Sequence, residues 1–335
     1  NKSFYRKSLT YHNFSEPRYD HLFINNKKNL KRRYSSEKFD NIHKNLAYSI
    51  QAYYEDAIIS LVKKLFLKTG ISNLCLAGGC ALNSVANMKL SNLHYIDNIF
   101  IQPAASDQGT ALGAVTLGAV RKYKKIYPIK SYYLGQNFSD NEILEELKLF
   151  NVKFRKINNR NSLVAKSLSK GKVVGLFQGR SEFGPRALGN RSILANPNIK
   201  NIKGILNRKI KFREDFRPFA PTVMQEFAND IFEIKNPSPY MTLTTKVKKK
   251  WRNKIAGVVH IDGTSRVQTL NKAQNKDYYE VINKFYSITK IPLVLNTSFN
   301  IKGEPIVENP KDAIRTFFGS GIDELYIGNY LVIKK

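Results

Sequence analysis

An arginine- and glycine-rich segment in the middle of the chain has the residue types that bind phosphate groups. The thirteen residues from Gly179 to Arg191 contain three arginines and three glycines. Glycines let backbone N–H groups approach an anion closely, and an arginine guanidinium can bind two phosphate oxygens at once. Only Glu182 is present to balance the arginines. The composition therefore favours an anion-binding loop over a surface loop whose arginines face solvent.

A second basic segment, Lys211 to Pro221, alternates cations with aromatic residues. Lysine supplies a compact charge and arginine a planar fork, a combination that suits a polyphosphate. The segment closes on Pro-x-x-Pro, which we expect to form a rigid turn. Its two acids, Glu214 and Asp215, leave a second interpretation open, in which the cations form surface salt bridges along an amphipathic edge.

Two further segments place polar side chains at the ends of apolar runs. Residues Val294 to Asn300 predict a buried strand followed by amides and hydroxyls, which could orient a ligand or form a turn that caps the next helix. The alternation of side chains along another predicted strand would put His260 and Asp262 on one face. A lone histidine is as often structural as functional, so both roles stay open for His260.

Two loops closer to the N-terminus also carry candidate residues. Gly78 and Gly79 precede a helix expected to run through Asn83, as in loops that hold a phosphate or a nucleoside, although one pair of glycines is a weak signal. Asp107 lies at a strand-to-helix junction. Its carboxylate could be a metal ligand or the N-cap of the helix, and position alone leaves both open.

The elements that would position these residues alternate between strands and helices. Apolar residues at helical spacing predict a helix from about Asn45 that ends at Gly70. Strands are predicted at 74–77 and 99–102, and the second is followed by an Ala- and Gly-rich helix over 111–120. This order of strand, loop and helix is typical of an α/β fold with its sites at strand ends.

A basic stretch at 121–135 predicts a domain boundary, with a short extended segment at 132–134. Ser139 and Glu142 form a capping-box pattern for a helix to about Phe150, and a second helix should end near Gly171. The remaining predicted strands are 172–178, 255–261, 292–295, 325–327 and 331–333, and the last two should be joined by a turn at Gly328-Asn329. Residues 1–40 lack periodicity and predict a loop-rich or poorly ordered lead.

The composition limits the class of protein. A chain of 335 residues with 42% hydrophobic residues is long enough for two packed domains. It has no apolar run long enough to span a membrane, and we expect no signal peptide. Its two cysteines, Cys75 and Cys80, fit a reducing cytoplasm. The net charge of +29 suits nucleotides and other small anions. Nucleic acid is the less favoured partner because no aromatic-interleaved RNA motif accompanies the lysines, and an AT-rich genome would also explain their number.

Five segments in order resemble the NodU/CmcH family of O-carbamoyltransferases over about residues 45–335. They are Leu-Ala-Gly-Gly-Cys-Ala-Leu-Asn, Pro-Ala-Ala-Ser-Asp-Gln-Gly-Thr-Ala-Leu-Gly-Ala, Gly-Arg-Ser-Glu-Phe-Gly-Pro-Arg-Ala-Leu-Gly-Asn-Arg-Ser-Ile, Arg-Glu-Asp-Phe-Arg-Pro-Phe-Ala-Pro and Asn-Thr-Ser-Phe-Asn. The resemblance implies that residues 1–130 are part of an actin-like, ribonuclease-H-fold module that binds iron or another divalent metal and transfers the carbamoyl group. It implies that residues 131–335 are a YrdC-like α/β domain. That domain would form carbamoyl adenylate from carbamoyl phosphate and ATP, with Mg²⁺, for transfer to a hydroxyl of a sugar, glycan or secondary metabolite.

The resemblance also implies roles for individual residues. Asp107 matches the metal-binding acid of the family. Gly78, Gly79 and Asn83 match its nucleotide-contacting loop. The catalytic tetrad of the YrdC-like part would be Lys211, Arg213, Ser298 and Asn300. The candidates for phosphate or substrate contacts are Arg186, Arg191, Arg217 and His260.

One departure from the family concerns histidine. The family begins with a lobe that carries two metal-binding histidines four residues apart, whereas the histidines here are His12, His21, His43, His94 and His260. We therefore expect that this lobe is absent, that the metal site is incomplete, and that the chain is competent at most for adenylation. A separate N-terminal lobe or a homo-oligomer could complete it. The alternatives are a YrdC-related protein that modifies or binds tRNA, and a non-catalytic partner subunit.

Overall fold

The computed structural model describes residues 37–126 and 128–334, which fall into two compact units. The loop-rich lead expected over 1–40 therefore lies almost entirely outside the described residues. The first unit contains helix α3, Asn41–Thr69, whose N-cap Asp40 accepts a hydrogen bond from the His43 N–H. The helix ends at Gly70 in the left-handed region, with φ of 69°, where glycine is favoured. The helix predicted to end at Gly70 is confirmed.

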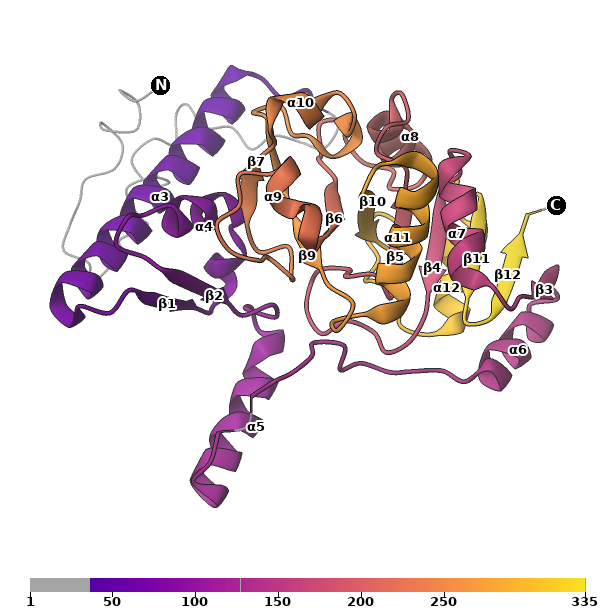
Figure 1. Cartoon of the computed structure of the whole chain (residues 1–335), viewed down its shortest axis with the longest axis horizontal. Coiled ribbons are helices and arrows are strands. Elements are labelled where there is room, and N and C mark those ends of the chain that lie inside the picture. The colour runs from indigo at the N-terminus through magenta and orange to yellow at the C-terminus, as the bar shows by residue number, and fades with distance from the viewer. Residues whose placement is uncertain (1–36, 127, 335) are drawn as a thin grey trace. The chain divides into compact units, whose positions relative to one another are not determined.

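The second unit begins with a two-stranded parallel sheet, β1 (Asn73–Leu76) and β2 (Asn98–Ile101) (Figure 1). Between the strands lie a 3₁₀ turn, Gly79–Leu82, and helix α4, Ser84–Ser91. Helix α5, Gln108–Tyr123, follows β2 and buries none of its residues. Both predicted strands and the Ala- and Gly-rich helix are therefore present.

The main body of the second unit is a mixed sheet of eight strands in the order β3-β12-β11-β4-β5-β10-β6-β9. Strands β4 and β11 are parallel, as are β6 and β9, and the other neighbours are antiparallel. The strands are β3 Phe154–Lys156, β4 Val174–Phe177, β5 Arg191–Ala195, β6 Ala220–Met224, β9 Gln268–Leu270, β10 Leu293–Ser298, β11 Glu324–Ile327 and β12 Tyr330–Ile333. This is the mixed α/β architecture expected from the sequence.

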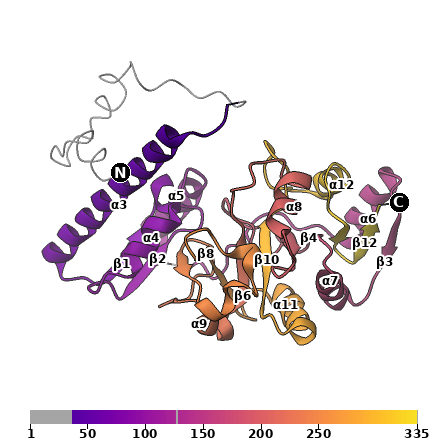
Figure 2. The ribbon, with the colours of Figure 1, turned by 90° about the horizontal axis from the view of Figure 1, so that it is seen from above.

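Helices cover both faces of this sheet. Figure 2 shows α7 (Arg160–Ser169) and α11 (Lys276–Thr289) on one side, and α8 (Ile202–Lys209) and α12 (Pro310–Phe318) on the other. Helix α6, Asp140–Leu149, starts at Ser139 with the predicted capping box to Glu142. Strand β4 is buried throughout, and β10 is buried up to Asn296, because apolar residues from both helical layers pack against them. Shorter elements complete the fold: η2 Gln225–Phe227, α9 Ala228–Ile231, β7 Thr244–Lys246, α10 Lys249–Arg252, η3 Ala256–Val258 and β8 Thr264–Arg266.

Two local predictions are wrong. Residues 255–261 do not form a strand: Ala256–Val258 are the 3₁₀ turn η3 and the others are turn or irregular backbone. Gly257 approaches the Pro197 loop, and its N–H donates to the Pro197 carbonyl at 2.9 Å. Pro221 belongs to β6 rather than to a turn, and the pairing of β9 with β6 begins only at Thr222. Pro221 therefore has a strand neighbour on one side only. Its missing N–H leaves no strand carbonyl on the other side without a donor.

No helix among residues 37–126 and 128–334 is long and apolar enough to cross a membrane.

Candidate functional site

A buried lysine is surrounded by oxygens from the end of β10. The Lys211 ammonium lies 2.6 Å from the Ser298 carbonyl and 3.1 Å from the Ser298 hydroxyl. It also lies 3.0 Å from the Asn300 carbonyl and 2.6 Å from Asn300 Oδ1. Lys211 is only 4% exposed. Three of the four predicted tetrad residues are thus in direct contact, and we call Lys211, Ser298 and Asn300 the lysine cluster.

Local structure on both sides holds the lysine cluster in place. Lys211 follows the end of α8, and its N–H donates to the Leu206 carbonyl at 2.8 Å. The next residue, Phe212, has φ of 46°, a strained conformation for a residue with a bulky side chain. On the other side, Phe299 is fully buried and its N–H donates to the Arg191 carbonyl at 3.0 Å. The chain just after β10 therefore stays hydrogen-bonded to β5, which holds Ser298 and Asn300 in place.

Arg213, the fourth tetrad residue, is positioned by α8 and by an aromatic ring. Its Nε donates to Asn207 Oδ1 at 2.8 Å, and its guanidinium lies 4.8 Å from the centre of the Phe219 ring. Asn207 is fully buried, and its amide also donates to the Arg217 carbonyl at 3.0 Å. The same asparagine therefore orients Arg213 and ties down the loop that carries it.

Three arginines and the Ser298 end of the lysine cluster border one small cavity of about 90 Å³. Its lining consists of Pro185, Arg186, Ala187, Arg213, Pro218, Phe219, Ala220, Met241, Arg266, Asn296, Thr297 and Ser298. Among the described residues, no carboxylate contributes to this lining. We call this space the arginine cavity.

The cations of the site are held in unfavourable surroundings. Burial lowers the pKa of Lys211 to about 7, with a further contribution from Arg213. Burial, and then Arg186 and Arg213, lower the pKa of Arg266 to about 9. Burial likewise lowers the pKa of Arg186, and burial followed by Arg217 lowers that of Arg213 to about 10. Desolvated cations that repel one another favour a bound anion, which would relieve both effects.

The arginine- and glycine-rich segment forms one wall of the cavity, and its single acid is used by the backbone. Glu182 accepts hydrogen bonds from the N–H groups of Leu188 and Asn190, both at 2.7 Å. Among the described residues, Arg186 forms no ion pair with Glu182 or with another carboxylate. From the opposite wall, the Asn296 amide donates to the Ala187 carbonyl at 3.2 Å, so β10 fixes the position of the segment.

Three other candidates for phosphate or substrate contacts lie elsewhere. Arg191 is fully buried in β5, stacks on Phe177 at 3.7 Å and donates to the carbonyls of Gln178 and Gln136. Its guanidinium thus joins main-chain segments. Arg217 is half exposed and pairs with Glu214 at 3.0 Å, as in the surface salt-bridge interpretation.

His260 lies in the turn before β8, where its Nδ1 is 3.1 Å from Thr264 Oγ1. The expected sharing of a strand face by His260 and Asp262 is wrong because this segment is not a strand. Burial lowers the pKa of His260 to about 4.

The two N-terminal candidate loops lie side by side. The Gly78 N–H donates to the Ala105 carbonyl at 2.7 Å, and a Cβ on Gly79 would lie 3.5 Å from Ser106 Oγ. The expected helix through Asn83 is instead a 3₁₀ turn followed by α4, and Asn83 Oδ1 accepts from the Ala86 N–H. Asn83 thus begins α4.

Asp107 occupies the N-cap position of α5 but makes no side-chain capping bond. Within residues 37–126 and 128–334, no three His, Cys, Asp or Glu side chains are grouped as ligands for one ion. Asp107 could contribute one ligand, but the described residues do not supply the rest of a metal site.

Arg266 and Asn296 belong to the site but were not predicted from the sequence. Arg266 lies only six residues after His260 and is followed by the buried Val267 and Gln268. A charged residue beside a buried run needs a partner or a ligand. This juxtaposition of Arg266 with a buried segment was the feature of the sequence that could have identified it. Asn296 was part of the predicted polar end of β10 but carried no separate signal.

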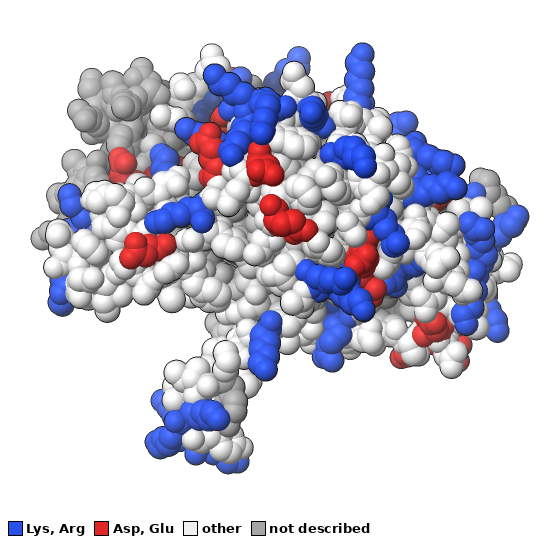
Figure 3. All heavy atoms as spheres, in the orientation of Figure 1, with Lys and Arg blue, Asp and Glu red and all other residues white. Residues whose placement is uncertain are grey.

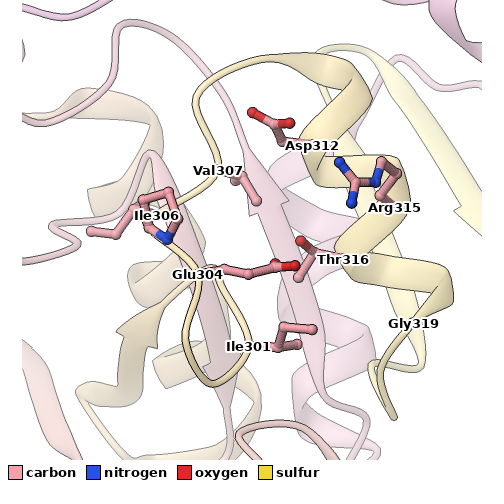
Figure 4. Close-up of a pocket in the computed structure, with 9 residues that line it drawn as sticks. Ile301, Glu304, Ile306, Val307, Asp312, Arg315, Thr316 and Gly319 are labelled. Atoms are coloured by element: carbon pink, nitrogen blue, oxygen red, sulfur yellow. The ribbon is translucent and has the colours of Figure 1, made fainter.

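A second cavity, of about 430 Å³, lies between α12 and the loop that follows Asn300 (Figure 4). The figure shows Glu304 extending toward Thr316, with Asp312 and Arg315 on α12. The Asn300 amide donates to the Glu304 carbonyl at 2.8 Å, which ties this loop to the lysine cluster. Two carboxylates line this second cavity, so the arginine cavity is the better place for a polyanion.

Comparisons with known proteins agree across the chain. Residues 165–334 match the family model described as Carbamoyltransferase C-terminus, and residues 2–116 match the one described as Carbamoyltransferase N-terminus. Nodulation protein NolNO of Sinorhizobium fredii is 40% identical over 308 residues, which cover 89% of this chain and 45% of that protein. Nodulation protein NolO of Bradyrhizobium diazoefficiens is 37% identical over 319 residues, covering 92% and 58%. An uncharacterized protein of Synechocystis, sll1178, is 38% identical over 319 residues, covering 86% and 52%.

Among solved structures, full-length HypF in a phosphate- and nucleotide-bound form is 18% identical, with a TM-score of 0.33 over 50% of this chain and 21% of that one. HypF of T. kodakarensis is 16% identical, with a TM-score of 0.36 over 53% and 22%. The chain spans about half the length of the curated relatives that it matches.

Proposed function

This chain belongs to the carbamoyltransferase family that includes the nodulation proteins, and from this premise we propose that it forms carbamoyl adenylate from carbamoyl phosphate and ATP. The observation that carries the proposal is the convergence of Arg186, Arg213 and Arg266 on a cavity that adjoins the lysine cluster. We assign this half-reaction to residues 131–335 as a YrdC-like domain. We assign residues 1–130 to part of the actin-like module that transfers the carbamoyl group to an acceptor.

The proposed chemistry needs positive charge at one place. Hydrolysis of carbamoyl phosphate gives carbamate and inorganic phosphate. A carbamate oxygen then attacks the α-phosphorus of ATP, the bond to the β-phosphate oxygen breaks, and pyrophosphate leaves. Both substrates are anionic, and negative charge builds up on the leaving pyrophosphate. Fixed cations in a water-poor cavity stabilise such a transition state without reorganising, and Mg²⁺ bound with ATP would neutralise further phosphate charge.

The lysine cluster has a distinct place in this scheme. Lys211 is held by the oxygens of Ser298 and Asn300, so it acts as a point charge in a fixed position. Arg213 has its Nε engaged by Asn207, and its Nη2 donates to the Pro218 carbonyl at 3.4 Å. Its Nη1 is the group we assign to an anion. We assign the lysine to the carbamate or the α-phosphate, and the three arginines to phosphate oxygens.

The transfer step is proposed at a coarser level. The acceptor would be a hydroxyl of a sugar, glycan or secondary metabolite. The use of ATP and carbamoyl phosphate, with only two cysteines, Cys75 and Cys80, suits the cytoplasm. No step is assigned to a metal at Asp107, since the described residues do not complete a site. A separate lobe or a second copy would supply what transfer requires.

Ser298 and Arg213 line the arginine cavity, whereas Lys211 and Asn300 are not part of its lining, and Lys211 adjoins it through its contact with Ser298. The non-catalytic alternative therefore stays open, and experiment decides it. Exchange of labelled pyrophosphate into ATP tests the proposal directly. We expect exchange that requires carbamoyl phosphate. A folded sample that shows no exchange, or exchange that ignores carbamoyl phosphate, would exclude the proposed half-reaction.

A further inference from the structure

A strongly basic segment lies around α10, away from the residues that line the arginine cavity. Between Lys246 and Lys254 the chain has six cations and no acid. The cations are Lys246, Lys248, Lys249, Lys250, Arg252 and Lys254. Figure 3 shows Lys and Arg side chains gathered over α10. We call these six residues the α10 basic patch.

The patch is anchored to the body but exposed to solvent. Trp251 is partly buried and packs against the main hydrophobic core, which fixes the short helix. Lys249, Lys250 and Lys254 remain exposed. Among the described residues, none of the six cations forms an ion pair with a carboxylate. Their charge is therefore available to a partner.

An exposed isoleucine lies beside this patch. Ile261 is 103% exposed, at the tip of the turn before β8. The turn contacts the patch directly, because the Val247 N–H donates to the Gly263 carbonyl at 2.9 Å and the Arg252 guanidinium lies against Gly263. None of the apolar residues in the described part of the chain covers this side chain, and its exposure to water is unfavourable.

The acids near the patch are few. Asp262 follows Ile261, but its Oδ1 is turned into the turn and accepts from the N–H and hydroxyl of Thr264, at 3.0 and 2.7 Å. Asp230 and Glu233 lie on the adjoining segment around α9, which pairs with residues 246–248 through main-chain hydrogen bonds. Within residues 37–126 and 128–334, these three acids against six cations leave the surface positive.

We propose that the α10 basic patch and Ile261 form a docking surface for an anionic lipid bilayer. Polybasic segments are attracted to anionic headgroups, and an adjacent apolar side chain adds affinity when it enters the interface. A fully exposed aliphatic residue at a turn tip has the geometry for such shallow insertion. Recognition of single-stranded RNA uses exposed aromatic rings that stack on bases, and the one aromatic residue of this segment packs against the core. Phosphate contacts to structured RNA would need the cations but not an exposed aliphatic side chain, so Ile261 favours the bilayer. Docking would hold the enzyme beside membrane-linked acceptors without a spanning helix.

Vesicle sedimentation tests the proposal with the full chain. The probes are vesicles of phosphatidylcholine alone and of phosphatidylcholine mixed with phosphatidylglycerol. We expect binding to the mixed vesicles only, weakening with added salt. The triple variant Lys249→Gln, Lys250→Gln, Lys254→Gln should weaken binding by roughly fivefold for each cation removed. Ile261→Ser should weaken it by roughly tenfold, because an aliphatic side chain no longer leaves water.

A matched control removes equal charge from the end of α5, as Lys122→Gln, Lys124→Gln, Lys125→Gln, and should change binding much less. Thermal melting should be unchanged in all variants, since the substituted side chains are exposed. Absence of binding to mixed vesicles, or equal losses in the two triple variants, would overturn the proposal. A third outcome would also overturn it: the wild-type chain binds tRNA, the α10 triple variant does not, and Ile261→Ser binds vesicles as the wild type does. The surface would then be an RNA site.

Discussion

The ammonium of Lys211 lies 2.6 Å from Oδ1 of Asn300, a residue 89 positions further along the chain. The contact joins the end of α8 to the loop after β10, and it exists only in the folded sheet. Replacing Lys211 by Met keeps the aliphatic stem but removes the charge. We expect pyrophosphate exchange to fall on the order of 10²–10³-fold, as for loss of one preorganised electrostatic group. Lys302→Met, at an exposed position of the next loop, should leave exchange nearly unchanged.

The pH dependence of anion binding should follow Lys211. Its pKa falls from 10.5 to about 7 in the folded protein, so the ammonium is lost as the pH rises through about 7. Affinity for ATP should therefore decrease above this pH. Over the same range the unfolded chain binds more protons than the folded one, so the free energy of unfolding should increase with pH until about 10.5.

Calorimetric titration with ATP and urea unfolding across the pH range would measure the two trends. In Lys211→Met, the ATP affinity and the free energy of unfolding should both depend much less on pH. A wild-type protein whose ATP affinity does not change on either side of neutral pH would contradict the assignment of Lys211 to an anion.

Arg266 offers a test of the arginine cavity that is separate from the lysine. Arg266→Lys keeps a positive charge but cannot reproduce the two-pronged guanidinium. We expect the KM for ATP or carbamoyl phosphate to rise roughly 10- to 100-fold, the cost of losing charged hydrogen bonds, with little change in stability. The comparison is Arg121→Lys on the exposed end of α5. Equal kinetics for both variants would remove Arg266 from the site.

Gly189 should be sensitive to any side chain. Its φ is 114°, and a Cβ at this position would lie 2.1 Å from Cδ1 of the buried Tyr278 ring. Gly189→Ala should lower the free energy of unfolding by about 2–4 kcal/mol, from backbone strain and overpacking. Gly113→Ala in α5 meets nothing within 4 Å and should stabilise by about 0.5–1 kcal/mol. Urea unfolding curves would give both values.

Features set by neighbouring residues could be predicted from the sequence. The capping box at Ser139 and the glycine that ends α3 depend on contacts within one helical turn, so the pattern was sufficient. The apolar run that forms β10 was also predicted from its residues. The contact between Lys211 and Asn300 depended on long-range pairing that no local pattern reports.

The failures have a shared physical cause. Residues 255–261 are apolar enough for a strand, but tertiary packing of Gly257 against the Pro197 loop favours a 3₁₀ turn. Arg191 carries the same charge as Arg186, yet one joins buried carbonyls and the other lines the cavity. Composition gives the residue type, whereas the role depends on where the fold places the side chain: Arg191 begins β5, and Arg186 lies in the loop before it.

The order of strands in the large sheet has a consequence for biosynthesis. Strand β4, at residues 174–177, pairs with β11 at 324–327, and β5 pairs with β10. A ribosome must therefore release about 150 further residues before β4 finds its second neighbour. Until then the apolar β4 strand presents an open edge that can template aggregation. Nascent chains of this protein should consequently depend on chaperones that shield β4 until β11 has been made.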